Sequence, residues 1–109
     1  MRRKTPGEGE VLNMYVKINK SSDSGVVAVC DEDLIGKTLK GNSMELKVSE
    51  FFYKGEIKSE AEAIEIMKKA KNLNILGEKS IAAALKAGVI TKENIVYVGG
   101  VPHAQAYAL

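Results

Sequence analysis

The sequence predicts an α+β fold: a single domain in which a small mixed or antiparallel sheet of about four to five strands packs against two helices. Strand patterns cluster in the first half of the chain, two helical patterns follow, and one more strand pattern comes near the end. The chain has 109 residues, the usual size of one domain. Its content of 45% hydrophobic and 28% charged residues is typical of a globular domain with its own core.

The first elements are a tail and a strand hairpin. Residues 1–13 contain glycine, proline and mixed charges without a periodic apolar pattern, which indicates a flexible tail and places the domain at 14–109. Residues 14–20 alternate between apolar and polar, as a half-buried strand does. Residues 21–25 have turn chemistry, and the apolar run 26–30 predicts a strand covered on both faces.

The middle of the chain is less regular. Asp31 is placed to cap a short turn that ends at Gly36. After a turn at residues 41–43, the alternation of residues 44–50 predicts a strand whose apolar side chains, Met44, Leu46 and Val48, point inward. An aromatic run follows at residues 51–53.

The helices carry clear boundary signals. Ser59 and Glu62 form the S-x-x-E pattern of a capping box, and lysines gather where this first helix should end, near residue 71. An alanine-rich second helix is expected from Gly77 to Lys86, with Gly88 as its C-terminal stop. Residues 95–98 then predict the last strand.

Composition excludes several classes of function. Cys30 is the one cysteine, so an internal disulfide is excluded, and without a Cys/His cluster we expect neither a metal site nor a cofactor. These features fit a reducing, cytoplasmic location. No apolar run approaches the roughly 20 residues that span a bilayer, so we expect no membrane partner. From Met14 onward the cations are all lysines, which allow salt-dependent phosphate contacts but no bidentate arginine contacts.

Five segments between about residue 14 and residue 105 form a recognisable series: "MYVKINK", "VVAVCDEDLIGKT", "FFYKGE", "NILGEKSIAAAL" and "GGVPHAQ". In this order and at this spacing they resemble a known archaeal family, the domain of unknown function 424. The resemblance implies an archaeal cytoplasmic protein with that family's fold and suggests a link to translation or RNA. It carries over no catalytic residue.

The segment "GGVPHAQ" is the first candidate site. Gly99 and Gly100 would allow a ligand to approach the backbone closely, and the rigid Pro102 would direct His103 toward it. Alternatively, the glycines form a tight bend that ends an edge strand, and His103 and Gln105 tie the chain end to the body of the domain.

A catalytic pair is the second candidate. Cys30 would act as nucleophile and His103 as base, with Asp31 or Gln105 orienting the histidine. Against this, a cysteine at the end of an apolar strand is usually a small core residue, and the acidic neighbours in "CDED" would raise the thiol pKa.

Two further candidates concern anions and bases. The start of the second helix, with Gly77, Lys79 and Ser80, offers free amides to an anion, although a carboxylate of the protein itself, Glu78, is expected to occupy them.

The aromatic run lies beside lysines, so Tyr53, Lys54 and Lys58 are candidates for stacking on single-stranded bases. The alternative is that two of the three aromatic side chains belong to the core and one is exposed.

The function favoured by these observations is a non-enzymatic binding module whose partner is RNA or a ribonucleoprotein. One alternative is a small enzyme that uses Cys30 and His103. Another is a protein-interaction subunit that docks on a partner through its C-terminal tail. The sequence specifies neither the strand order nor the oligomeric state.

Overall fold

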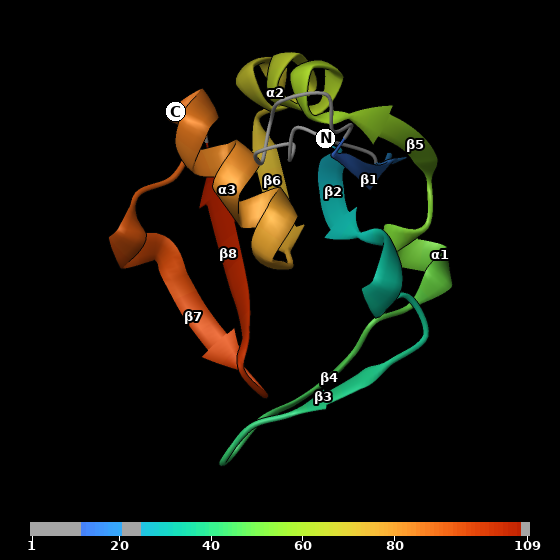
Figure 1. The fold of residues 1–109 in the computed structure, drawn as a ribbon, viewed down its shortest axis with the longest axis vertical. Helices are drawn as coiled ribbons and strands as arrows, with labels where there is room; N and C mark the ends of the chain where they lie inside the picture. Colours follow the sequence, from blue (N-terminus) through green and yellow to red (C-terminus); the bar gives the residue numbers. More distant parts are fainter. Residues whose placement is uncertain (1–11, 21–24, 108–109) are drawn as a thin grey trace, which may run out of the picture.

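A computed structural model describes residues 12–20 and 25–107, and it shows a six-stranded sheet in the order β5-β1-β2-β6-β8-β7 together with a separate two-stranded hairpin, β3-β4 (Figure 1). The strands are β1 (Asn13–Asn19), β2 (Val26–Asp31), β3 (Thr38–Lys40), β4 (Glu45–Lys47), β5 (Glu56–Ser59), β6 (Asn72–Leu76), β7 (Ile95–Val98) and β8 (Val101–Tyr107). The α-helices are α1 (Glu50–Tyr53), α2 (Glu60–Lys69) and α3 (Glu78–Ala87), and two 3₁₀ turns are η1 (Glu32–Leu34) and η2 (Lys92–Asn94).

The α+β class and the mixed sheet are confirmed, but the expected element counts are wrong. The described residues form six strands in the main sheet instead of about four to five, and three α-helices instead of two. The central pair, β2 and β6, is parallel, whereas every other neighbouring pair is antiparallel. Residues 1–11 and most of the expected turn, 21–24, lie outside the described residues. Leu12 and Asn13, assigned above to the tail, belong to the fold, because Leu12 accepts a hydrogen bond from Glu60 N and Asn13 pairs with Ser59.

One face of the sheet is covered by α2 and α3 (Figure 1). Side chains from the central strands, among them Val29 and Ile75, meet Met67 of α2 and Ile81 of α3 in the larger core. The predicted capping box of α2 is present, and α3 ends at Gly88 in the left-handed conformation, as expected. We call this side of the sheet the helix face.

The opposite face is covered over only part of its area. A second core gathers Cys30 and Leu76 from the sheet with Leu34 of η1, Val48 and Tyr53 of α1. The β3–β4 hairpin extends from this core toward the tip of the β7–β8 hairpin (Figure 1). There the two hairpins are close, since a Cβ on Gly99 would lie 3.1 Å from the backbone N and O of Lys40. We call this side of the sheet the open face.

The middle of the chain differs from the sequence prediction in the strand at 44–50, in the aromatic run 51–53 and in the turn after β2. The predicted strand 44–50 is shorter, because Ser49 already caps α1 by accepting a hydrogen bond from Phe52 N at 3.3 Å. Val48 points into the core as expected, whereas Met44 is exposed. The short turn after β2 exists, but Asp31 makes no side-chain cap there.

Four strands were missed: the short strands β3 and β5, and the inner strands β6 and β8. The residues of β6 and β8 have weak strand propensity. β6 carries asparagines at two of its five positions, and β8 is interrupted by Pro102 and rich in alanine. Both strands are stabilised by pairing on each side. Pro102 is tolerated because the β6–β8 ladder ends with the pair Leu76 and His103, so the proline nitrogen has no partner to lose.

The segment "GG" in "GGVPHAQ" is the turn of a β-hairpin. Gly99 and Gly100 have φ of 58° and 80°, the positive values that a two-residue hairpin loop needs at both positions. β7 is an edge strand that ends in a tight bend, as the structural alternative expected. The residues that follow are an inner strand and not a tail tied to the surface.

Among the described residues, no helix has the length and apolar character needed to cross a membrane.

Candidate functional site

The strand register brings polar side chains together on the open face. In one row across the sheet, Asn72 of β6 lies beside Tyr107 of β8. In the next row Asn74 lies beside Gln105, and Lys17 of β1 belongs to the same row, separated from Asn74 by Ala28 of β2. In the third row His103 lies beside Leu76. We call the following residues the open-face patch: Lys17, Asn72, Asn74, His103, Gln105 and Tyr107.

A short hydrogen-bonded chain organises the centre of this patch. The hydroxyl of Tyr53 donates to Asn74 Oδ1 at 2.8 Å, and His103 Nε2 lies 3.0 Å from the same oxygen. Since Asn74 Oδ1 is an acceptor, His103 donates through Nε2–H. Tyr53 is 3% exposed, so it anchors α1 to the sheet through its hydroxyl and cannot stack on a ligand.

The centre of the patch is neutral near pH 7. Burial lowers the pKa of His103, because the imidazolium ion loses its hydration more than the neutral ring does. Burial, followed by the neighbouring Cys30 thiol, raises the pKa of Tyr53 to about 12. The chain from Tyr53 through Asn74 to His103 therefore presents amide and imidazole groups that can form hydrogen bonds without a charge.

Exposed aromatic rings flank the patch on two sides. Tyr107 is 72% exposed at the end of β8 and Phe51 is 84% exposed on α1. Lys17 Nζ lies 5.7 Å from the centre of the Phe51 ring, within the range of a cation–π contact. Asn19, from the row beside Lys17, donates to Phe52 O at 3.0 Å and so helps hold α1 in this position.

The described strands of the main sheet carry no carboxylate at their open-face positions. These strands contain two acidic residues, and both lie elsewhere. Glu56 of β5 pairs with Val16 and so lies on the helix face, and Asp31 lies at the end of β2. Within the described ranges, no group of three or more His, Cys, Asp and Glu side chains is arranged to hold a metal ion.

The amides at the start of α3 bind a carboxylate of the protein itself, and this carboxylate is Asp31. Asp31 Oδ2 accepts from Lys79 N at 3.0 Å, while Oδ1 accepts from Ser80 N at 2.8 Å and from Ser80 Oγ at 2.7 Å. The expectation that Asp31 caps the turn after β2, and that Glu78 occupies the α3 amides, is therefore wrong. The parallel pairing of β2 with β6 places the end of β2 beside the start of α3.

Gly77 makes room for this carboxylate. Its φ is +109°, and a Cβ at this position would lie 2.3 Å from Asp31 Cγ. At the predicted anion site of Gly77, Lys79 and Ser80, the amides of Lys79 and Ser80 are thus occupied by the buried Asp31 side chain, while Gly77 N donates to Pro102 O.

Cys30 and His103, the predicted catalytic pair, are not neighbours in the sheet. Both side chains lie on the same sheet face, but Leu76 stands between them in the row, which sets their Cα atoms about 10 Å apart. Burial, with the nearby carboxylates of Asp31 and Asp33, raises the pKa of the Cys30 thiol to about 12. The Cys30 thiol is fully buried and donates to Asp31 O at 3.4 Å.

The remaining predicted binding residues are dispersed. Pro102 is buried, and because it directly precedes His103 in the strand it faces the opposite side, the helix face. Gly99 and Gly100 lie at the tip of the β7–β8 hairpin. Lys54 forms an ion pair with Glu50 at 3.9 Å.

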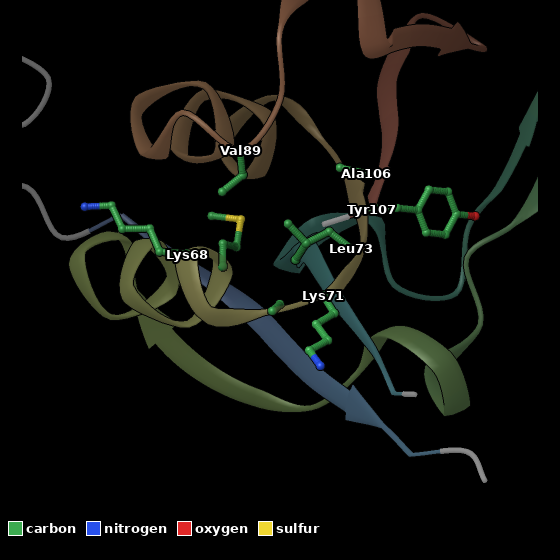
Figure 2. A pocket seen from close by; sticks show the side chains of 8 residues that line it. Lys68, Lys71, Leu73, Val89, Ala106 and Tyr107 are labelled. Carbon is green, nitrogen blue, oxygen red and sulfur yellow. The ribbon is translucent and has the colours of Figure 1, made fainter. Parts of the chain in front are cut away.

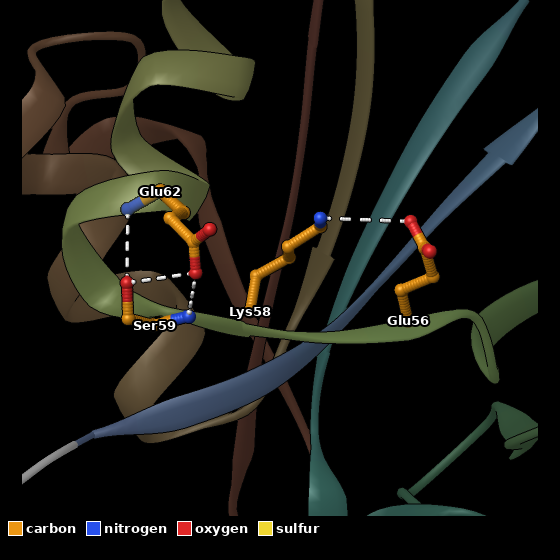
Figure 3. Close-up of polar contacts among 4 residues, drawn as sticks. All are labelled: Glu56, Lys58, Ser59 and Glu62. Atoms are coloured by element: carbon orange, nitrogen blue, oxygen red, sulfur yellow. Dashed lines mark hydrogen bonds and ion pairs between the residues drawn. The ribbon is translucent and has the colours of Figure 1, made fainter.

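Lys58, the other lysine predicted to lie beside Tyr53, is on the opposite side of the sheet. It pairs in register with Met14, a residue of the larger core, and its Nζ lies 3.6 Å from Glu56 Oε1 beside the capping box of Ser59 and Glu62 (Figure 3). Tyr53, Lys54 and Lys58 therefore do not form one surface.

A small pocket of about 130 Å³ lies on the helix face, between the end of α2 and the strands β6 and β8. Met67 is among its lining residues. Apolar side chains of Leu73 and Val89 line it as well (Figure 2). The Tyr107 ring is turned away from this pocket toward the open face (Figure 2).

Most of the open-face patch was missed from the sequence. His103 and Gln105 were singled out, but Lys17, Asn72, Asn74 and Tyr107 were not. The asparagines in "NLNIL" alternate with buried leucine and isoleucine, and this spacing is the signal that could have placed both amides on one strand face.

Comparisons with known proteins agree with the archaeal resemblance. A crystal structure of an uncharacterized conserved protein from Methanopyrus kandleri superposes with a TM-score of 0.77 at 33% identity, and the match covers 87% of this chain and 90% of that one. Comparison with curated proteins gives no match. The family model described as protein of unknown function (DUF424) matches residues 19–109, which shows that the chain belongs to this family.

Proposed function

We propose that this protein is a non-enzymatic binding module of the archaeal cytoplasm that binds single-stranded RNA, free or within a ribonucleoprotein, on the open face of its sheet. The observation that carries the proposal is the composition of that face. Amide groups, a neutral histidine and a lysine lie between two exposed aromatic rings, Tyr107 and Phe51, on strand positions without a carboxylate.

These groups match the needs of a single-stranded ligand. Exposed aromatic rings stack on bases of any sequence, and side-chain amides form hydrogen bonds with base edges. A carboxylate on the same surface would repel the phosphates, so its absence from these strands favours a polyanion. The sheet holds the patch rigidly, because β6 and β8 each pair with strands on both sides.

The same geometry argues against the two alternatives. Leu76 separates Cys30 from His103, and the carboxylate of Asp31 is bound to α3. Residues 101–107 form an inner strand, so a truncation after Gly100 would remove part of the fold and not a docking tail.

Fluorescence anisotropy with labelled single-stranded RNA oligonucleotides tests the proposal. We expect binding at low ionic strength that weakens with salt, with a shallow slope of about −0.7 in log K against log salt, since Lys17 is the one lysine at an open-face position of the described strands of the main sheet. Tyr107→Ala should weaken binding by about 1–3 kcal/mol through lost stacking.

Two matched controls make the test specific. Ile18→Ala changes an exposed side chain on the helix face and should leave RNA binding unchanged. Lys17→Gln should weaken binding, whereas Lys69→Gln, at the exposed end of α2, should not. The absence of binding at low salt, or an equal loss in all four variants, would contradict the proposal.

A further inference from the structure

The outer edge of β7 lacks the features that usually protect a sheet edge. No described residue pairs with this edge, and the strand "IVYV" contains neither a charge, a proline nor a bulge. The other edge strand, β5, does carry charges, Glu56 and Lys58. Because free N–H and C=O groups on an uncharged edge invite another strand, β7 is the edge of the described sheet that is open to pairing.

Pro102 fixes which backbone groups of β7 face outward. Tyr97 pairs in register with Pro102, which has no N–H, and the Pro102 carbonyl accepts instead from Gly77 N at 2.9 Å on the other side. The pair is therefore of the type without mutual hydrogen bonds, so Tyr97 N–H and C=O point toward the free edge. A neighbouring strand would find both groups available.

Apolar side chains accompany this edge on both sheet faces. Val96 is 54% exposed on the open face and Tyr97 is 67% exposed on the helix face. Beside Tyr97, a groove of about 520 Å³ runs between β7 and α3, and its apolar lining includes Ile81 and Leu85. A strand that pairs with β7 would cover apolar surface on both sides.

Two opposite charges lie at the two ends of this groove. Glu78 lines the groove at the start of α3, next to Gly77 and so at the level of Tyr97 and Pro102. Lys92 lines the same groove near Ile95, at the other end of the strand. When β7 pairs antiparallel with β7 of a second copy, the Glu78 end of each groove faces the Lys92 end of the other. The dimer then contains two such contacts.

We propose that the protein forms a two-fold symmetric dimer in which the β7 edges of two copies pair antiparallel and Glu78 of each copy faces Lys92 of the other. The self-complementary charges favour a second copy over an unrelated peptide, because one surface supplies both partners of each ion pair. The six-stranded sheets of the two copies then form one continuous sheet.

A charge-swap experiment tests this arrangement on the full chain. Sedimentation velocity over a concentration series should show a monomer–dimer equilibrium for the wild type. Glu78→Lys and Lys92→Glu, each alone, should raise the dimer dissociation constant about tenfold, because two ion pairs become repulsive contacts. An equimolar mixture of the two variants should recover the wild-type dissociation constant, because every charge contact in the heterodimer is again complementary.

The mixture also controls for folding, since a variant that fails to fold cannot regain dimerisation on mixing. Isotope labelling of one variant identifies the heterodimer by native mass spectrometry. A monomeric wild type at its highest soluble concentration, or a mixture that dimerises no better than its components, would overturn the proposal.

A second pair of variants tests the edge itself. Val96→Lys places a charge at the pairing edge and should abolish the dimer. Ile18→Lys changes an equally exposed apolar residue, 56% against 54%, on β1 and should leave it intact. If both variants dimerise alike, pairing through β7 is wrong.

Discussion

At the scale of single residues, Asp31 is a polar side chain that joins distant parts of the fold. It leaves the end of β2 and binds two amides and a hydroxyl at the start of α3, 48 and 49 positions further along the chain. The carboxylate offsets the positive end of the helix dipole from a buried position. This contact ties the parallel strand pair to the helix that covers it.

Asp31→Ala should therefore destabilise the protein by about 2–4 kcal/mol, since it removes a helix cap and leaves the Ser80 hydroxyl without its acceptor. Chemical denaturation measures this change. Asp33→Ala, at an exposed position two residues away, is the matched control and should change stability by less than about 0.5 kcal/mol. Equal effects of the two substitutions would show that the cap is not important.

Cys30 should be inert in the folded protein. Its thiol is fully buried with a pKa of about 12, so almost no thiolate exists at pH 8. Iodoacetamide should modify Cys30 only after denaturant is added, as measured by mass spectrometry over time. Rapid alkylation of the native protein would revive the hypothesis of a nucleophilic cysteine.

His103 should make stability depend on pH. Burial lowers its pKa in the folded state below the ordinary value of 6.5, so the unfolded chain binds a proton more readily. Stability is therefore complete above about pH 6.5 and falls as the pH decreases below it. Tyr53 and Cys30, which lie on the same face, stay neutral in this range because their pKa values are about 12.

The comparison of pH 7.5 with pH 5.5 by chemical denaturation isolates this effect. His103→Gln keeps an N–H donor for Asn74 Oδ1 but cannot titrate, so it should lose less stability over this interval than the wild type. An equal loss in both proteins would mean that His103 does not respond to pH in this way.

At the scale of elements, the sequence predicted those whose signal is local. The alternation in β1, the apolar run of β2 and the capping box of α2 each lie within a few residues, and each was confirmed. β6 and β8 were missed because their stability comes from neighbours on both sides. α1 was missed because aromatic residues favour strands, whereas here the Ser49 cap and the burial of Tyr53 stabilise a helical turn.

The site could be predicted only in part, for the same reason. "GGVPHAQ" directed attention to His103 and Gln105, and "NILGEKS" to an anion site. Their partners are set by the strand order. Asn74 lies 29 positions from His103 in the sequence, and Asp31 lies 48 and 49 positions from Lys79 and Ser80. No local pattern contains that information.

At the scale of the whole molecule, the two proposals use different sides of the same sheet. The open-face patch lies on β1, β6 and β8, while the pairing edge is β7. A dimer through β7 would place two open-face patches on one continuous sheet, so a long RNA could contact both. Dimerisation and RNA binding nevertheless depend on different residues and can fail independently.

The most direct test of the RNA proposal is an NMR titration of the ¹⁵N-labelled protein with a single-stranded RNA oligonucleotide at low salt. We predict that shifts concentrate on Lys17 and on the open-face positions of β6 and β8, with the Asn74 and Gln105 side-chain amides among them. The amides of α2 should stay in place, since that helix covers the opposite face. Shifts confined to the helix face, or no shifts at all, would contradict the account.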